Sequence, residues 1–339
     1  MEAAPAGSIP EVDAFDSLLG AAHDRGLRVH AWVNVLSLST RRDARLIEDL
    51  GRSAVLVDRS GRSILDYPDL DVPPPDRRYY RMGTRGVYLD PAVPTVRARL
   101  VEIFADLVAR HPDLDGLHLD YIRHPGVLPF SPGSRFGVGL EFGYGAIGRA
   151  RYRAETGQPD PIEGAPPGVV RRASIWDDWR RAQVTKLVEE IAAAARSLQP
   201  DLVLSAAVIP YFDRAYLSLA QDWRRWLESG AIDLAMPMVY TLDDRLFRYQ
   251  VETFAGWPLA DRLWPGVGVW LFDDDPERAL RQLEILREQG FSGELLFSDD
   301  AIAESPALRR ALASAPPASS VSSAAAVSAE ARPETAARP

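Results

Sequence analysis

The sequence predicts an α/β fold, a TIM (β/α)8-type barrel that is incomplete at its N-terminus. Apolar runs rich in β-branched residues alternate with segments of helical periodicity, and strands separated by helices form a parallel sheet. About six strand–helix units can be recognised, whereas a closed barrel contains eight. Polar or aromatic residues lie near the C-terminal ends of the predicted strands, where barrel enzymes have their active sites: Asn34, Asp120, Tyr240, Trp270 and Asp299.

The chain begins within a predicted helix rather than a strand. Asp13 can cap this helix, and Gly26 would end it, because glycine tolerates the left-handed backbone found just past a helix C-terminus. A second helix is predicted over residues 96–110, with Pro94 in its first turn. Extended segments are predicted over residues 27–36, 53–58 and 116–122, and a proline-rich stretch covers residues 66–76.

The second half of the chain follows a loop rich in Gly and Pro, residues 125–170. This loop is too long for an ordinary connection, so we expect a functional loop that contains short helices. Helices are predicted over residues 175–198, over 223–229 before Gly230, and from Pro276 to Gly290 with Asp275 as the cap. Strands are predicted over residues 201–210, 232–241, 263–271 and 293–297.

Two domains follow from this pattern. Residues 1–312 are expected to form the barrel of about six strand–helix units. Residues 313–339 consist mainly of Ala, Ser and Pro and have no apolar periodicity, so we expect a disordered tail.

The composition argues against several classes of protein. A net charge of −9 disfavours nucleic-acid binding, which needs a basic surface. The absence of cysteine excludes disulfides, thiolate metal sites and cysteine nucleophiles. No apolar run reaches about 18 residues, so no membrane-spanning helix is predicted, and residues 1–10 lack a signal-peptide pattern. The histidines lack the spacing of a metal site, and we expect no metal or cofactor.

The most informative segment is DGLHLDYIRHP, residues 115–125. Side chains alternate along a strand, so His118 and Asp120 point to one side and the leucines between them to the helix layer. Arg123 follows at the start of the loop, where it can pair with a carboxylate. A purely structural polar network is the competing interpretation. We predict that Asp120 is a catalytic carboxylate, because barrel active sites lie at this end of the strands.

This segment resembles the fourth strand of the glycoside-hydrolase-like family 10 proteins, bacterial barrel proteins in which it reads much like GIHLDYIRYP. Residues 25–34 look like the family's third strand and residues 236–241 like its sixth. Residues 142–157 and 179–181 are similar to the loop and helix after the fourth strand, so the resemblance covers residues 14–298.

The resemblance implies that the family's first two strands should precede Ala14. We therefore expect the chain to be a fragment or to have a misplaced start. Family members are often exported, so the localisation stays open.

The resemblance also implies a glycosidase that acts on a polysaccharide, with bacterial cell-wall glycan as the expected substrate class. Glycoside hydrolysis usually needs two carboxylates, one that protonates the leaving oxygen and one that acts as nucleophile or base. Asp120 is the first. Asp243 is preferred as the second because it closely follows the predicted strand at 232–241, and Asp244, Glu141 and Asp299 are alternatives. We expect a retaining mechanism in which Asp120 attacks the anomeric carbon.

Other side chains at these strand ends are candidates for binding the carbohydrate. Aromatic faces stack on sugar rings, while polar side chains bond the hydroxyls, although core packing is the competing role of the aromatic residues. The predicted substrate-binding residues are His118, Arg123, Trp32, Asn34, Tyr240, Trp270 and Asp299.

Two other functions stay open. A chitinase-like enzyme that uses the substrate's own acetamido group would share the strand motif, but it needs a Glu where Ile122 stands. A truncated barrel that binds carbohydrate without catalysis is the third possibility. The expected partner is a carbohydrate and not a nucleic acid, and the sequence predicts no oligomeric state.

Overall fold

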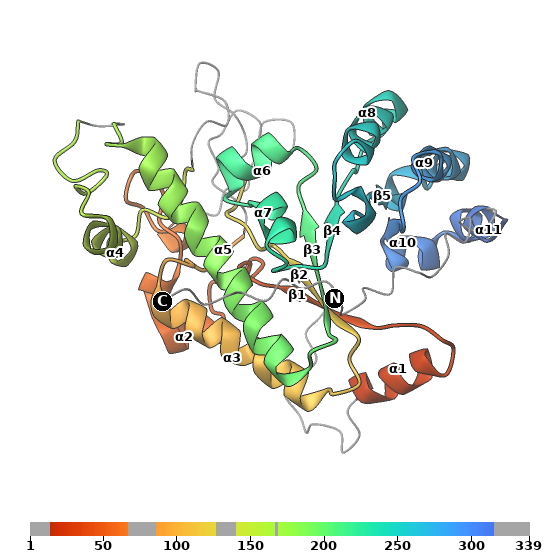
Figure 1. Ribbon diagram of the computed structural model, residues 1–339, viewed down its shortest axis with the longest axis horizontal. Helices are drawn as coiled ribbons and strands as arrows, with labels where there is room; N and C mark the ends of the chain where they lie inside the picture. The colour runs from red at the N-terminus through yellow and green to blue at the C-terminus, as the bar shows by residue number, and fades with distance from the viewer. Residues whose placement is uncertain (1–13, 67–85, 127–139, 167–168, 315–339) are drawn as a thin grey trace, which may run out of the picture. The chain divides into compact units, whose positions relative to one another are not determined.

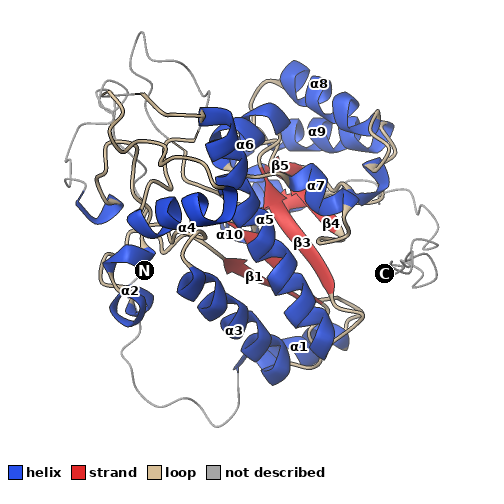
Figure 2. Ribbon diagram, turned by 60° about the vertical axis from the view of Figure 1, so that its left-hand side comes forward, coloured by secondary structure: helices blue, strands red, loops and turns tan. Residues whose placement is uncertain are grey.

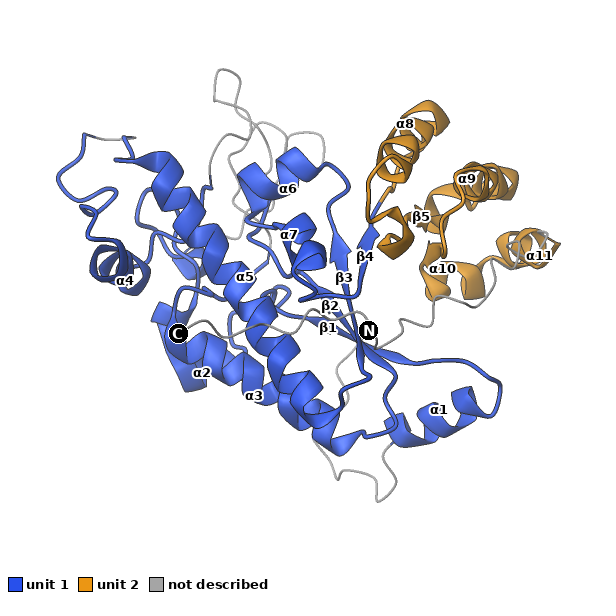
Figure 3. Ribbon diagram, in the orientation of Figure 1, with its two compact units in different colours: residues 1–238 blue, residues 239–339 orange. Residues whose placement is uncertain are grey.

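The computed structural model describes residues 14–66, 86–126, 140–166 and 169–314. The chain divides into two compact units, Met1–Met238 and Val239–Pro339 (Figure 3). Each unit is described by itself below. A single barrel domain over residues 1–312 therefore stays a prediction.

A four-stranded parallel sheet forms the centre of the first unit, with the strands in chain order (Figure 2). Its register places His118 beside Trp32 and Ser205, so these three side chains share one face. Leu117 and Leu119 on the other face are fully buried, as the alternation predicts. The strands are β1 (His30–Asn34), β2 (Gly116–Asp120), β3 (Val203–Val208) and β4 (Leu234–Pro237).

Helices pack on the sheet of the first unit, and the two longest, α3 and α5, lie side by side (Figure 1). α3 buries Val96, Leu100, Phe104 and Val108, which recur every four residues along one face, and Pro94 opens the helix as predicted. The α-helices of this unit are α1 (Ala14–His23), α2 (Arg45–Leu50), α3 (Pro94–Arg110), α4 (Ala146–Thr156), α5 (Ala173–Leu198), α6 (Phe212–Leu219) and α7 (Trp223–Glu228).

Segments that follow β1 and β2 form an irregular layer beyond the C-terminal ends of these strands. The backbone N–H groups of Leu38 and Leu89 bond the carbonyls of Val87 and Leu36, which explains why β1 is shorter than the predicted strand 27–36. The segment predicted to be extended over 53–58 begins as a 3-10 helix, η1 (Arg52–Ala54), and continues through isolated bridges; a second 3-10 helix is η2 (Ile64–Asp66). Most of the proline-rich stretch 66–76, and residues 127–139 of the long loop, lie outside the described residues.

The second unit contains a two-stranded parallel sheet and four α-helices within its described residues. The strand predicted over 263–271 is wrong at its end, because Trp270 lies in a 3-10 helix. The Trp270 ring folds back over Gly268, where a Cβ atom would lie 2.6 Å from it. The elements are α8 (Asp244–Ala255), η4 (Ala260–Arg262), β5 (Gly266–Gly268), η5 (Val269–Phe272), α9 (Pro276–Glu288), β6 (Leu295–Phe297), α10 (Asp299–Glu304) and α11 (Pro306–Ser314).

Most of the predicted helix boundaries are confirmed. Gly26, Gly230 and Gly290 have positive φ angles just past the ends of α1, α7 and α9. Asp275 does precede α9, but its side chain makes no capping hydrogen bond and lies 3.9 Å from Arg281 instead. Asp13 lies outside the described residues.

The structure confirms an α/β fold with parallel strands. Closure of the six strands into one barrel stays a prediction. Residues 313 and 314, where the tail was expected to begin, belong to α11. The rest of the expected tail, residues 315–339, lies outside the described part of the chain. Within the part that is described, no helix has both the length and the apolar character needed to cross a membrane.

Candidate active site

Asp120 is the last residue of β2 and lies at the C-terminal end of the sheet in the first unit. Only 7% of the residue is exposed. The backbone N–H of Tyr121 donates to its Oδ1 at 2.6 Å, and Arg123 Nη1 lies 3.4 Å from the same atom. The indole Nε1 of Trp32 donates to Oδ2 at 3.2 Å. Three N–H donors therefore fix the orientation of one carboxylate: two follow Asp120 in the chain, and the third, from Trp32, comes from the neighbouring strand β1.

Tyr121 has a left-handed backbone with φ of 49°. This conformation is uncommon for an aromatic residue, and it turns the backbone N–H back toward the preceding carboxylate. The ring lies under the Arg123 guanidinium at 4.5 Å and contacts Tyr88, with ring centroids 6.2 Å apart. Sequence reasoning missed Tyr121, because nothing in the residue type signals a positive φ angle.

Trp32 and Asn34 occupy the adjacent strand, β1. Asn34 is the register partner of Asp120, and both it and Trp32 are exposed. Trp32 exposes 57% of its surface while its N–H stays bonded to Asp120. An exposed aromatic face beside a carboxylate is suited to a sugar ring that stacks on the indole while its anomeric carbon approaches the oxygen.

His118 lies one layer deeper on the same face as Asp120. Its Nδ1 lies 2.9 Å from Ser205 Oγ, and the Ser205 hydroxyl donates to the carbonyl of Leu117. The hydroxyl has one hydrogen, and when it is donated to the Leu117 carbonyl, the contact with His118 is made by Nδ1–H as donor. Burial lowers the pKa of His118 to about 4, and burial also lowers the pKa of His30 on β1. His118 is therefore a neutral donor at pH 7.

Buried histidines make the fold sensitive to acid. Burial lowers the pKa of His118 to about 4, and burial together with Arg180 and Arg181 lowers that of His124 to about 3, from an ordinary value of 6.5. The unfolded chain binds these protons first, so the free energy of unfolding should fall as the pH drops from 6.5 toward 4. Each histidine contributes at most about 1.4 kcal/mol per pH unit.

Asp90 acts in the opposite direction. Burial raises its pKa to about 6, so its share of stability is greatest at low pH and is lost as the pH rises through 6. The pH dependence that Asp90 adds to the free energy of unfolding therefore cancels that of only one of the two histidines, His118 and His124. Urea unfolding at pH 7, 6 and 5 would measure the net slope, and His118→Asn should reduce it. An equal slope in this variant and the parent would contradict the prediction.

Glu141 also belongs to the first unit, in the loop that precedes α4. Arg59 holds it twice: the Arg59 backbone N–H donates to the Glu141 carbonyl, and the guanidinium lies 3.6 Å from Oε1. Glu141 is partly exposed, whereas the residues on both sides of it are buried. Two residues later, a Cβ atom added to Gly143 would lie 3.2 Å from the His124 ring, and His124 follows Asp120 by four residues. Glu141 is thus carried by a segment that lies against His124, four residues past the end of β2.

Asp243 caps α8 in the second unit. Its side chain accepts hydrogen bonds from the backbone N–H groups of Arg245 and Leu246, and it pairs with the Arg245 side chain at 3.1 Å. The Arg245 side chain and these backbone groups lower the pKa of Asp243. A general acid needs a raised pKa, so these contacts favour a structural role over the catalytic role expected from the sequence.

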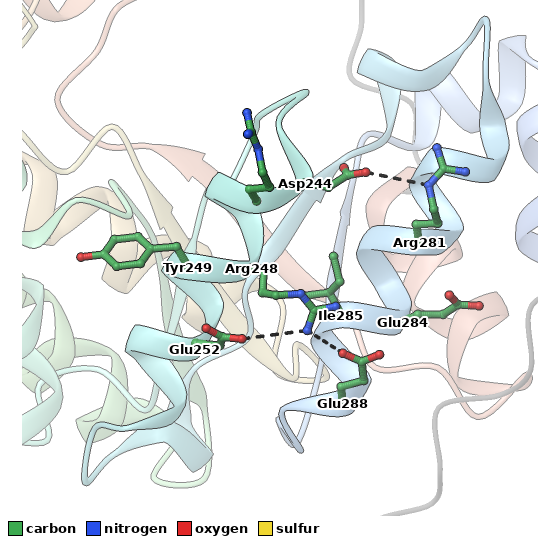
Figure 4. Close-up of a pocket in the computed structure, with 9 residues that line it drawn as sticks. Asp244, Arg248, Tyr249, Glu252, Arg281, Glu284, Ile285 and Glu288 are labelled. Atoms are coloured by element: carbon green, nitrogen blue, oxygen red, sulfur yellow. Dashed lines mark hydrogen bonds and ion pairs between the residues drawn. The ribbon is translucent and has the colours of Figure 1, made fainter.

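Asp244, the first residue of α8, is tied to the neighbouring helix α9. Its Oδ1 accepts from Gln282 Nε2 at 3.0 Å, and its Oδ2 lies 3.8 Å from Arg281 (Figure 4). The cavity beside it, about 420 Å³, is lined by charged residues that pair with one another, such as Arg248 with Glu288 at 2.7 Å. These pairings again favour a structural role for Asp244.

The substrate-binding residues predicted in the second unit lie in an aromatic cluster and at the N-terminus of a helix. Tyr240 contacts the ring of Trp270 at 4.8 Å and that of Phe297 at 5.7 Å, and 41% of Trp270 is exposed. Asp299 is the exposed first residue of α10, which agrees with a role at the turn into a helix. Within the residues that the structure describes, no three His, Asp or Glu side chains are placed to share a metal ion.

Comparisons with known proteins agree on a carbohydrate-active family. The family model described as glycosyl hydrolase-like 10 matches residues 4–260. The chain is 25% identical over 323 residues to glycosyl hydrolase DigH of Escherichia coli K12, covering 87% of this chain and 65% of that protein. It is 23% identical over 249 residues to glycosyl hydrolase YngK of Bacillus subtilis, covering 69% of this chain and 40% of the relative. The chain thus spans less than two thirds of these relatives.

Solved structures share the fold. The glycoside hydrolase domain of PgaB (BpsB) from Bordetella bronchiseptica superposes with a TM-score of 0.63 at 18% identity, covering 88% of this chain and 79% of that one. The β-galactosidase Gan42B from G. stearothermophilus gives a TM-score of 0.56 at 10% identity, covering 84% and 43%. At these identities the similarity establishes an α/β fold shared with glycosidases.

Proposed function

The chain belongs to the glycosyl hydrolase-like 10 family, and from this premise we propose that it hydrolyses glycosidic bonds of a polysaccharide. The observation that carries the proposal is the Asp120 carboxylate, which is held by three N–H donors at the end of β2, next to the exposed indole of Trp32. A carboxylate beside an aromatic face is the combination that glycoside hydrolysis uses. Bacterial cell-wall glycan is the substrate class that we propose.

In the proposed mechanism Asp120 is the nucleophile. Its carboxylate oxygen attacks the anomeric carbon, and the glycosidic oxygen leaves with a proton from a second carboxylic acid. Water then takes the place of the leaving group and hydrolyses the glycosyl-enzyme, with the second carboxylate as base. The donors from Tyr121 and Trp32 keep the attacking oxygen in position, because they bind the carboxylate from two directions.

We propose Glu141 as the second carboxylate. Asp243 and Asp244, the earlier candidates, are bound as a helix cap and in contacts with α9. Glu141 caps no helix; it pairs with Arg59 at 3.6 Å, and its loop lies next to His124, just beyond Arg123. Glu141 therefore has the more favourable setting, and the spacing between it and Asp120 decides whether the enzyme retains or inverts configuration.

The structure does not favour the chitinase-like alternative, which requires a catalytic Glu at the position of Ile122. Ile122 is fully buried, so a catalytic side chain could not reach solvent from this place without moving the backbone. A carbohydrate-binding protein without catalysis remains the alternative that an activity assay has to exclude.

The proposal is tested by the release of reducing ends from purified peptidoglycan and from simple polysaccharides, with Asp120→Asn as the control. We expect release from at least one amino-sugar polymer by the parent chain and none by the variant. Binding of the same polymer without release by either protein would instead identify a non-catalytic carbohydrate-binding protein.

Two substitutions at Trp32 should separate its ring from its N–H group. Trp32→Phe keeps an aromatic face but removes the donor to Asp120, so kcat should fall about tenfold while KM changes little. Trp32→Ala removes both the aromatic face and the donor. Its kcat should fall as in Trp32→Phe, and its KM should also rise about tenfold, because the stacking surface is lost. Steady-state kinetics on a soluble glycan would measure both constants. Equal kinetics of the Phe and Ala variants would rule out stacking on Trp32.

A further inference from the structure

Arg180 is a buried cation on α5 that donates to a distant loop as well as to Asp177 of its own helix. Only 1% of the residue is exposed. Its Nη1 donates to the carbonyls of Leu140, at 3.2 Å, and Phe142, and its Nη2 donates to the Tyr144 hydroxyl at 3.4 Å. The guanidinium also lies 4.3 Å from the centre of the Tyr144 ring. A planar group with several donors can hold a loop backbone in this way, and an ammonium group could not hold it in the same geometry.

The two carbonyls that Arg180 binds lie on either side of Glu141. Leu140 and Phe142 are fully buried, and Glu141 between them is partly exposed. The same guanidinium thereby fixes the backbone before and after Glu141. Together with Arg59, which bonds the Glu141 carbonyl, these contacts set the direction in which the Glu141 side chain leaves the loop.

Arg180 also reaches the segment that follows Asp120. Both the Arg180 side chain and the His124 ring lie against Gly143: an added Cβ would be 3.0 Å from Arg180 Cδ and 3.2 Å from His124 Cε1. Gly143 has a φ of 91°, so its left-handed backbone and its missing side chain allow this approach. Arg180 thus contacts the loop of Glu141 where that loop lies against His124, four residues after Asp120.

Three buried polar atoms around the contact of Arg180 with Gly143 have no hydrogen-bond partner among the described residues. Asp90 Oδ2, His124 Nδ1 and Arg180 Nε are buried and unpaired within the described part of the chain. Asp177 is the ion-pair partner of Arg180. A buried ion pair contributes little net stability, because the cost of desolvating both charges offsets their attraction. Stability alone therefore does not account for a buried arginine at this position.

We infer that Arg180 is a positioning residue that fixes Glu141 relative to Asp120, an inference that rests on the proposed function. Its hydrogen bonds hold the Glu141 loop, and its side chain packs where that loop meets His124. A general acid has to lie within hydrogen-bond reach of the leaving oxygen, so a loop displaced by about 1 Å loses much of its rate.

The neighbouring residue Arg181 provides a matched control. It is also buried on α5, donates to the carbonyl of Tyr216 at 2.8 Å, pairs with Asp178, and lies 3.6 Å from the centre of the Tyr216 ring. Arg181 therefore holds α6 in the way that Arg180 holds the Glu141 loop. Arg180→Met and Arg181→Met each remove a buried guanidinium of the same helix together with an ion pair, a carbonyl hydrogen bond and a ring contact.

The experiment compares kcat, KM and melting temperature of these two variants, below the lower melting temperature. We expect Arg180→Met to lower kcat about 100-fold with KM within about threefold, and to change the limb of the pH–rate profile that Glu141→Gln also changes. Arg181→Met should lower the melting temperature and leave kcat and the pH profile intact. Guanidinium ion added to Arg180→Ala should restore part of the rate.

Equal kcat values in Arg180→Met and the parent, or equal losses in both variants, would overturn the inference. If Arg180→Met does not fold, Arg180→Lys provides the test. This variant keeps the positive charge but lacks the planar set of donors, so kcat should still fall. An unchanged kcat would overturn the inference. The proposed function fails separately, since it requires Asp120→Asn to abolish turnover whatever the Arg180 variants do.

Discussion

Asp120→Ala is expected to lower the turnover of a susceptible polysaccharide by about 10⁴-fold, because it removes the nucleophile and leaves only binding and the remaining polar groups. Added azide should restore part of the rate. In the cavity left by the carboxylate, azide can bond to the anomeric carbon while the leaving oxygen takes its proton from the second carboxylic acid. The product would be a glycosyl azide of inverted configuration, which mass spectrometry and NMR can identify.

Asp115 supplies the control for this variant. It lies just before β2, at the opposite end of the strand from Asp120, and its carboxylate bonds the backbone N–H of Val29 and the ring of His23. Asp115→Ala should therefore lower stability without an effect on kcat. Turnover of Asp120→Ala within about tenfold of the parent would exclude Asp120 as the nucleophile. Rescue that yields an azide of retained configuration would also exclude it, because this product forms from a glycosyl-enzyme and would identify Asp120 as the acid/base instead.

Glu141→Gln is expected to lower kcat on a natural glycan by about 10²- to 10³-fold, since protonation of the leaving oxygen is lost. The loss should be much smaller on an aryl glycoside whose phenolate leaves without a proton. Kinetics on the two substrates would measure this contrast, which identifies a general acid rather than a residue that holds the fold.

Asp243→Ala is the comparison for Glu141→Gln. It removes the cap of α8, so the melting temperature should fall, while kcat on both substrates should stay within about threefold of the parent. If Asp243→Ala lost the rate on the natural glycan and Glu141→Gln did not, the assignment of the second carboxylate would be reversed.

The elements nearest the site were predictable because their signals are local. The alternation of His118 and Asp120 with leucines predicts both the strand and the face on which they lie, and the register confirms that face. The glycines after α1, α7 and α9 mark the helix ends because the backbone there is left-handed. Such signals depend on the residue and its close neighbours alone.

The surroundings of the site were not predictable from the sequence, because they depend on contacts between residues far apart in the chain. Arg180 looks in the sequence like one of many charged residues of an amphipathic helix, and only the packing of a distant loop buries it. The left-handed backbone of Tyr121 has no sequence signal. The helical role of Asp243 did have a sequence signal, since Phe247, Val251 and Phe254 follow it at helical spacing, but Asp243 also closely follows a predicted strand.

The separations along the chain between the groups of the site set the order in which it can assemble. Trp32 and Asp120 are 88 residues apart, so the nucleophile is oriented only after β1 has paired with β2, a closure that a growing chain can make once Arg123 has been synthesised. The loop of Glu141 has to wait longer, because its two carbonyls are bound from α5, 38 and 40 residues farther on. Newly made protein would therefore pass through a stage in which the Asp120 carboxylate is fixed and Glu141 is still loosely held.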